Sequence, residues 1–144
     1  MEMREILFRG KRETDGEWIF GSLVKKINSA YIICEKIVGC VVDYTEYEVD
    51  PETVCQYTGL TDKNGRKIFE GDICGTKFFG KDNGKGQNFS DYDIFKVVYK
   101  YGIYLLENNQ RQFSAQYIPD MSGDGIEVIG NIFDNPELIG GNAE

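Results

Sequence analysis

Residues 57–74 read YTGLTDKNGRKIFEGDIC, and this stretch decides how the rest of the chain is interpreted. Gly59 and the pair Asn64-Gly65 mark turns, because glycine and asparagine tolerate the positive φ that tight turns require. The short apolar runs beside them are typical of β-strands. The stretch therefore predicts a hairpin at Asn64-Gly65, a bend at Gly71 and a new strand that starts at Asp72.

The same stretch holds two acids that invite a chemical interpretation. Glu70 and Asp72 are two residues apart, so on a regular strand they would share a face and could act as acid and base or hold a metal. Gly71 between them favours a bulge that breaks this alignment. We therefore expect Glu70 to be solvated and Asp72 to accept backbone hydrogen bonds at a turn.

Two further patterns resemble ligand sites only in part. Asp62 and Asn64 alternate as in a calcium loop, but Arg66 stands where a third oxygen ligand belongs. Residues 80–91 contain a glycine-rich run that lacks the spacing, the hydroxyl residue and the following helix of a phosphate-binding loop. We expect a turn at the first, a long flexible loop at the second, and neither a metal nor a cofactor in the protein.

The composition argues against several function classes. The chain has 144 residues, no histidine and a net charge of −8. Without histidine there can be no Ser-His or Cys-His pair, which argues against an enzyme on chemical grounds. The acidic charge repels phosphate backbones, so nucleic acid is not the expected partner. The N-terminal MEMREILFRG has no apolar signal core and no run reaches transmembrane length, so we expect a cytoplasmic protein without membrane contact.

The remaining pattern is that of a mainly β protein with few short helices. Asp15-Gly16 suits a two-residue hairpin turn, Gly21 marks a bulge or a close approach, and Asp50-Pro51-Glu52 suits a single helical turn. Residues 108–118 are equally compatible with a helix and with an irregular connection. The expected strands are Glu5–Arg9, Trp18–Val24, Tyr31–Ile33, Ile37–Val42, Tyr44–Val49, Lys67–Phe69, Asp72–Cys74, Tyr92–Tyr101, Gly102–Leu106 and Ile126–Phe133.

The turn positions suggest two subdomains in one compact unit. We predict an N-terminal β-subdomain over residues 1–58 and a C-terminal β-barrel subdomain over residues 59–144. Gln56, Tyr57 and Thr58 would form the seam between them.

Four strings resemble the YopX family of phage and prophage proteins: REILFRGK, DGEW, PETVCQYTGLTDKNGRKIFEGDI and EVIGNIFDNPEL. The resemblance implies a mostly β fold with a small C-terminal barrel, SH3-like in size, and a biochemical role that is uncharacterised. It supplies no catalytic residues. Cys55 stands where the family pattern leads us to expect glycine.

We therefore expect a non-enzymatic accessory protein encoded by a phage or prophage, a β-barrel module that binds a protein partner or self-associates through exposed strand edges. One alternative is a nucleic-acid-related role, as an acidic mimic or a small-barrel binder. A second is a carboxylate-based, metal-dependent hydrolase that uses Glu70 and Asp72. The candidate structural and interaction residues are Gln56, Tyr57, Thr58, Gly59, Asp62, Asn64, Gly65, Glu70, Gly71 and Asp72.

Overall fold

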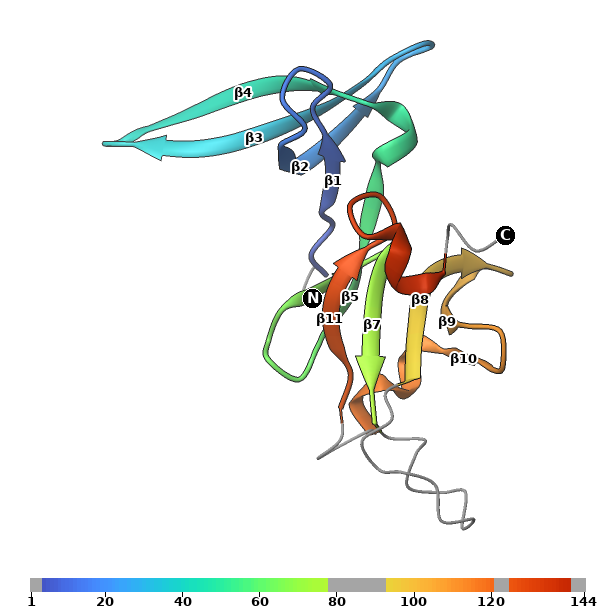
Figure 1. Cartoon of the computed structure of the whole chain (residues 1–144). Helices are drawn as coiled ribbons and strands as arrows, with labels where there is room; N and C mark the ends of the chain where they lie inside the picture. The colour runs from blue at the N-terminus through green and yellow to red at the C-terminus, as the bar shows by residue number, and fades with distance from the viewer. Residues whose placement is uncertain (1–3, 78–92, 121–124, 141–144) are drawn as a thin grey trace, which may run out of the picture. The chain divides into compact units, whose positions relative to one another are not determined.

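The computed structural model describes residues 4–77, 93–120 and 125–140, which are mostly β-strand (Figure 1). The glycine-rich loop predicted at residues 80–91 lies outside these ranges. Within them, the helical elements are short 3-10 turns: η1 (Pro51–Thr53), η3 (Ala115–Asp120) and η4 (Pro136–Ile139). The prediction of a mainly β protein with few short helices is confirmed.

The strands form two antiparallel sheets. The six-stranded sheet has the order β4-β3-β2-β1-β5-β6 and consists of β1 (Phe8–Lys11), β2 (Trp18–Lys25), β3 (Ala30–Val38), β4 (Val41–Val49), β5 (Cys55–Thr61) and β6 (Lys67–Phe69). The five-stranded sheet has the order β10-β9-β8-β7-β11 and consists of β7 (Asp72–Thr76), β8 (Asp93–Lys100), β9 (Ile103–Glu107), β10 (Gln112–Ser114) and β11 (Glu127–Asn131). Among the described residues, no strand pairing closes either sheet into a barrel.

The chain divides into two compact units between Gly59 and Leu60, and β5 runs through this division. The core of the first unit is small and consists of Ala30, Ile32 and Val49, with Phe8 and Ile19 among the half-buried residues around it. Its strands pack tightly because of one glycine. A Cβ at Gly21 would lie 2.2 Å from the backbone oxygen of Ile33, so the close approach expected at Gly21 is present.

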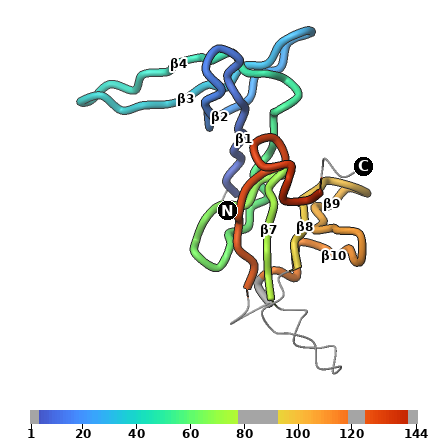
Figure 2. Tube along the Cα trace, viewed as in Figure 1, coloured from blue at the N-terminus to red at the C-terminus, as the bar shows by residue number. Residues whose placement is uncertain are grey.

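The core of the second unit is larger. It joins Ile68 of β6 to η3 and to the five-stranded sheet, whose strands β7 to β10 are labelled in Figure 2. Phe95, which is fully buried, meets Phe113 edge to face at a centroid distance of 5.2 Å. The buried members are Ile68, Cys74, Phe95, Val97, Leu106, Ala115, Ile118, Ile126 and Val128. Each large apolar side chain in such a core contributes roughly 1.5–3 kcal/mol.

Three local predictions need correction. The connection between β1 and β2 covers residues 12–17, because Asp15 accepts a hydrogen bond from the amide of Glu17 and does not take the positive φ of a two-residue turn. Residues 37–42 are not one strand, since the chain reverses at Gly39-Cys40 between β3 and β4. Residues 108–118 are neither one helix nor a wholly irregular connection, because Gln112–Ser114 form β10 and the 3-10 helix η3 begins at Ala115.

Candidate functional site

The ten candidate residues lie on one continuous stretch that runs from β5 to the start of β7. Gln56, Tyr57 and Thr58 are half-buried in β5, and the amide of Tyr57 donates to the carbonyl of Leu7 at 2.8 Å. Gly59, at the end of the first unit, has a φ of 90°. The remaining candidates, Asp62, Asn64, Gly65, Glu70, Gly71 and Asp72, lie in the second unit.

Asp62 is buried in the loop between β5 and β6, and its carboxylate is bound by backbone amides. Its Oδ1 accepts from the amides of Asn64 and Arg66, both at 2.9 Å. Its Oδ2 accepts from the amide of Val128 on β11, also at 2.9 Å. Only 6% of the residue is exposed. One buried carboxylate thus closes the Asn64-Gly65 turn and joins it to a strand more than sixty residues later in the sequence.

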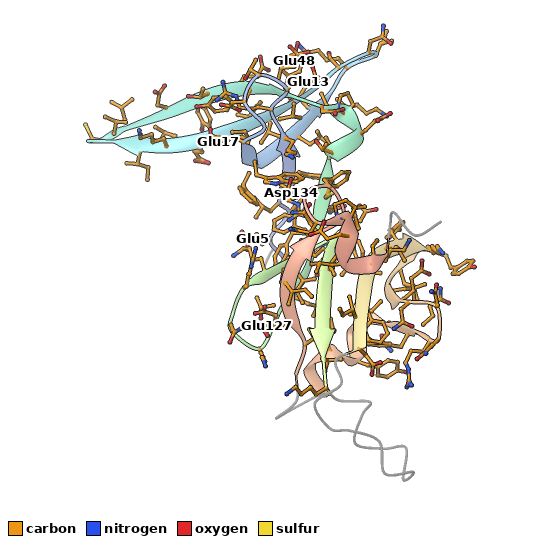
Figure 3. All side chains as sticks on the ribbon, viewed as in Figure 1. Glu5, Glu13, Glu17, Glu48, Glu127 and Asp134 are labelled. Carbon is orange, nitrogen blue, oxygen red and sulfur yellow. The ribbon has the colours of Figure 1, made fainter. Side chains whose placement is uncertain are left out.

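The edge of this loop is exposed, and its side-chain contacts are longer. Glu127 of β11, labelled in Figure 3, lies 4.0 Å from the ammonium group of Lys63 and accepts a 3.5 Å hydrogen bond from the side chain of Asn64. Gly65 has a φ of 81°, as a turn glycine should. The loop therefore has a rigid buried centre around Asp62 and a solvated rim.

Glu70 and Gly71 form the turn between β6 and β7, so Glu70 and Asp72 are not on one regular strand. Asp72 is buried, and its Oδ2 accepts from the amide of Phe69 at 2.7 Å, as expected. Gly71 has a φ of 86°, donates its amide to the carbonyl of Val97 and accepts from the amide of Ile132, both at 2.9 Å. Glu70 is half-buried rather than fully solvated. The turn between β6 and β7 is thus bonded to β8 and to the residue that follows β11.

The thiol of Cys74 on β7 is buried and feels the charges of the same two acids, Asp72 and Asp62. Burial raises its pKa far above the ordinary value, and the nearby carboxylates of Asp72 and Asp62 raise it further. A thiol in this environment stays protonated and is not a nucleophile. No group of three or more cysteines, aspartates and glutamates in the described ranges is arranged to hold a metal ion.

Cys55, which stands where the family pattern suggests glycine, is also buried and sits at the start of β5. Its φ is not positive, since Tyr101 is the only non-glycine residue with a positive φ in the part of the chain that is described. The position therefore imposes no backbone strain on a cysteine.

A second polar cluster lies on the five-stranded sheet around Glu107. Its carboxylate accepts from Lys100 at 3.0 Å and from the side-chain amide of Gln112 at 2.8 Å, and it lies 3.9 Å from the ammonium of Lys96. The hydrogen bond from Lys100 is the main cause of the lowered pKa of Glu107. A pocket of about 320 Å³ beside it is lined by Ile94, Lys96, Glu107, Asn108, Asn109, Leu138 and Ile139.

This cluster bears on the nucleic-acid alternative. Both lysines of β8 have Glu107 as an ion-pair partner, which reduces their attraction for phosphate. Phe95 is in the core, and Tyr99 packs edge to face on Tyr104 at 5.0 Å.

The β3–β4 hairpin is the most exposed element of the first unit (Figure 1). β3 and β4 pair in nine consecutive positions, from Ala30↔Val49 to Val38↔Val41. β2, the other neighbour of β3, pairs with it only as far as Ile33. Beyond Ile33 the hairpin is therefore a two-stranded ribbon, and every residue from Glu35 to Glu46 is exposed. Side chains stand out on both sides of it (Figure 3).

The end of this ribbon is apolar on both faces. We call residues Ile37–Val42 the hairpin tip; they carry no charge. Because directly opposed residues share a face, Ile37 and Val42 lie on one face with Tyr44, and Val38 and Val41 lie on the other. Ile37 is 74% exposed and Tyr44 64%. Apolar side chains gathered at one end of an element and uncovered on both faces are typical of a contact surface.

Sequence reasoning missed this surface because it read residues 37–42 as one strand. The available signal was Gly39 in the middle of the apolar run IVGCVV. Gly39 has a φ of 64°, which favours glycine at the first position of a two-residue hairpin turn.

Comparisons with known proteins identify the fold and leave the activity open. Residues 7–140 match the family model described as "YopX protein". No curated protein matches the chain. A solved structure, the crystal structure of protein EF1440 from Enterococcus faecalis, is similar with a TM-score of 0.60 and 24% sequence identity, covering 95% of this chain and 99% of that one. In the described residues, no helix is long and apolar enough to cross a membrane.

Proposed function

The chain belongs to the YopX family, and from this premise we propose that it is an accessory protein of a phage or prophage that acts in the host cytoplasm without enzymatic activity, by contacting a protein partner or a second copy of itself. Under this proposal its contact surface is the hairpin tip together with Tyr44. The barrel expected for the family would lie in the second unit, where β6 and the five-stranded sheet share one core.

The exposure of the β3–β4 hairpin is the observation that carries the proposal. An isolated two-stranded ribbon is at best marginally stable in water, because it buries little apolar surface. The ribbon beyond Ile33 places Ile37, Val38 and Val41 in solvent, with exposed fractions of 74%, 54% and 61%. A partner that covered these side chains would bury apolar surface that the fold leaves exposed, and burying such surface is favourable.

The acids of the central stretch support the non-enzymatic part of the proposal. A catalytic carboxylate must reach its substrate, whereas Asp62 and Asp72 are buried and accept hydrogen bonds from backbone amides. Both side chains therefore stabilise the turns that they belong to. Glu70, the remaining acid of the hydrolase alternative, lies in the turn next to Asp72.

The test compares three tagged forms of the full chain in capture experiments from infected host cells. The tip variant carries Ile37→Ser and Val42→Ser. The matched control carries Ile27→Ser, because Ile27 is 95% exposed but lies in the connection between β2 and β3, away from the tip. We expect a protein that is retained by the wild type and by the control and is lost from the tip variant. Equal retention by all three forms would place the contact surface elsewhere.

A further inference from the structure

We propose that the partner seated on the β3–β4 hairpin is a second copy of this chain, which pairs its own β4 antiparallel to the outer edge of β4 with Tyr44 on the two-fold axis. This inference rests on the proposed function and names the partner of the same surface. The two hairpins would form one four-stranded sheet of the order β3-β4-β4-β3.

β4 is an outer strand whose protection against pairing is limited to the charges of Asp43, Glu46 and Glu48. It is the last strand of the six-stranded sheet, and in the described residues no strand lies beyond it. Its pairing with β3 has no bulge over nine positions, and it contains neither proline nor lysine. Natural proteins use bulges, prolines, lysines or very short edge strands to prevent edge pairing. A regular edge of about 30 Å, from nine residues at 3.4 Å each, is open to another strand.

The turn determines which backbone groups face outward. In a two-residue hairpin the residues that flank the turn, Val38 and Val41, bond to each other, and the pattern then alternates along the strands. We infer that Val42, Tyr44, Glu46 and Glu48 direct their N–H and C=O groups to the open edge. An antiparallel copy related by a two-fold axis through Tyr44 sets Tyr44 opposite Tyr44 and Val42 opposite Glu46, so the outward groups of these three residues face those of the second strand, while Glu48 lies beyond the paired segment.

The side chains are compatible with this register. Tyr44 faces Tyr44 of the second copy, Val41 faces Tyr47, Asp43 faces Thr45 and Val42 faces Glu46, so no acid lies opposite an acid. Aromatic pairs directly opposed on a sheet are stabilising, and like charges are destabilising.

Other registers are less favourable. An axis through Asp43, Glu46 or Tyr47 sets acids opposite acids. An axis through Val42 pairs only three strand residues. An axis through Thr45 places Tyr44 opposite Glu46 and needs the edge as far as Val49, next to Asp50, whose amide already donates to the carbonyl of Lys11 at 2.8 Å.

The paired sheet also gathers apolar residues. Ile37, Val42 and Tyr44 lie on one face of each hairpin, so the two copies combine them on a common face. The opposing effect is charge, because each copy carries −8. Salt screens repulsion between like charges, so self-association should become tighter as ionic strength rises. A partner with a basic contact surface would show the opposite dependence.

The experiment is sedimentation velocity on the full chain, over a range of protein concentrations and at low and high salt. We expect the wild type to dimerise reversibly, more tightly at high salt. Tyr44→Asp and Tyr44→Lys each set like charges across the axis, and each should weaken self-association at least about tenfold. An equimolar mixture of the two variants sets opposite charges across the axis and should restore the dimer. The matched variant Ile27→Asp should dimerise like the wild type.

Three results would overturn the inference: a wild type that is monomeric in every condition, a dimer that neither Tyr44 variant weakens, or a mixture that stays as weak as the single variants. The mixture also excludes misfolding as the reason for weak association, since misfolded variants would not rescue each other. The two tests can fail separately. A failed dimer test would leave the tip-dependent capture, which tests the proposed function, unchanged. A failed capture would leave a dimer that tightens with salt unchanged.

Discussion

The loop around Asp62 and the β3–β4 hairpin both depart from the usual pattern of exposed charged and buried apolar side chains, but in opposite ways. In the loop an acid is buried, and all three of its recorded hydrogen bonds come from backbone amides. In the hairpin the apolar residues of the tip are exposed on both faces. Burying a charge is costly unless it is fully bonded, and exposing apolar surface is costly unless something covers it.

The difference separates residues that the fold explains from residues that it does not. A buried polar group with a full set of partners is accounted for by the fold, so Asp62 needs no ligand to explain it. An exposed apolar side chain is not explained by packing within its own unit. The acids that drew attention in the sequence are therefore explained by the fold, and this leaves the hairpin as the surface to which our proposal assigns the protein contact.

The largest effect is expected from Asp62→Ala. The substitution removes the acceptor of three backbone hydrogen bonds and leaves buried amides without a partner, so the free energy of unfolding should fall by about 3 to 4 kcal/mol. Urea unfolding measures it. Lys63→Ala is the control, because its ion pair with Glu127 is exposed and should contribute no more than about 0.5 kcal/mol. Equal stability of both variants would contradict the structural role of Asp62.

A smaller effect is expected at the neighbouring turn. Asp72→Ala loses the acceptor of the Phe69 amide and should destabilise by about 2 kcal/mol, and Glu70→Gln should stay within about 0.5 kcal/mol. Adding Mg²⁺ or Mn²⁺ should leave the Tm of the wild type unchanged. A metal-dependent rise in Tm that Glu70→Gln abolishes would revive the metal-dependent hydrolase, since a ligand stabilises the folded state that binds it.

The smallest effect is expected at the hairpin tip. At low protein concentration, Ile37→Ser combined with Val42→Ser should change the free energy of unfolding by less than about 0.5 kcal/mol, because both side chains are already in solvent. Ile32→Ala, in the same hairpin but fully buried, should cost about 3 kcal/mol in the same unfolding measurement. A loss of more than about 2 kcal/mol in the tip variant would show that the tip is covered within a single chain.

Local turn chemistry made much of the fold predictable. Gly59, Gly65 and Gly71 all have positive φ, and Asp50 caps the single turn η1 by accepting from the amide of Glu52 at 3.0 Å. These features depend only on residues that are close together in the sequence, so the local sequence was enough to predict them. The acceptor role of Asp72 was predictable for the same reason.

The rest depended on contacts between distant residues. The bond from the amide of Val128 to Asp62 joins positions 66 residues apart, and no pattern near either residue indicates it. The exposure of Ile37 and Val42 was hidden for a related reason. An apolar run reads as a buried strand, and only the extent of pairing between β2 and β3 shows that the run continues past the core.

The way in which the hairpin is attached has a consequence for how such chains can diverge. β2 pairs with β3 only over Ala30–Ile33, and Cys34 still packs against the core, so the exposed segment from Glu35 to Tyr44 can change length without altering the core. Deleting one residue from each strand would exchange the two faces, whereas deleting two from each would keep them. Each residue removed from both strands would shorten the reach by about 3.4 Å. Related chains could thus differ in the reach of the hairpin, in steps of two residues, while the body that supports it stays the same.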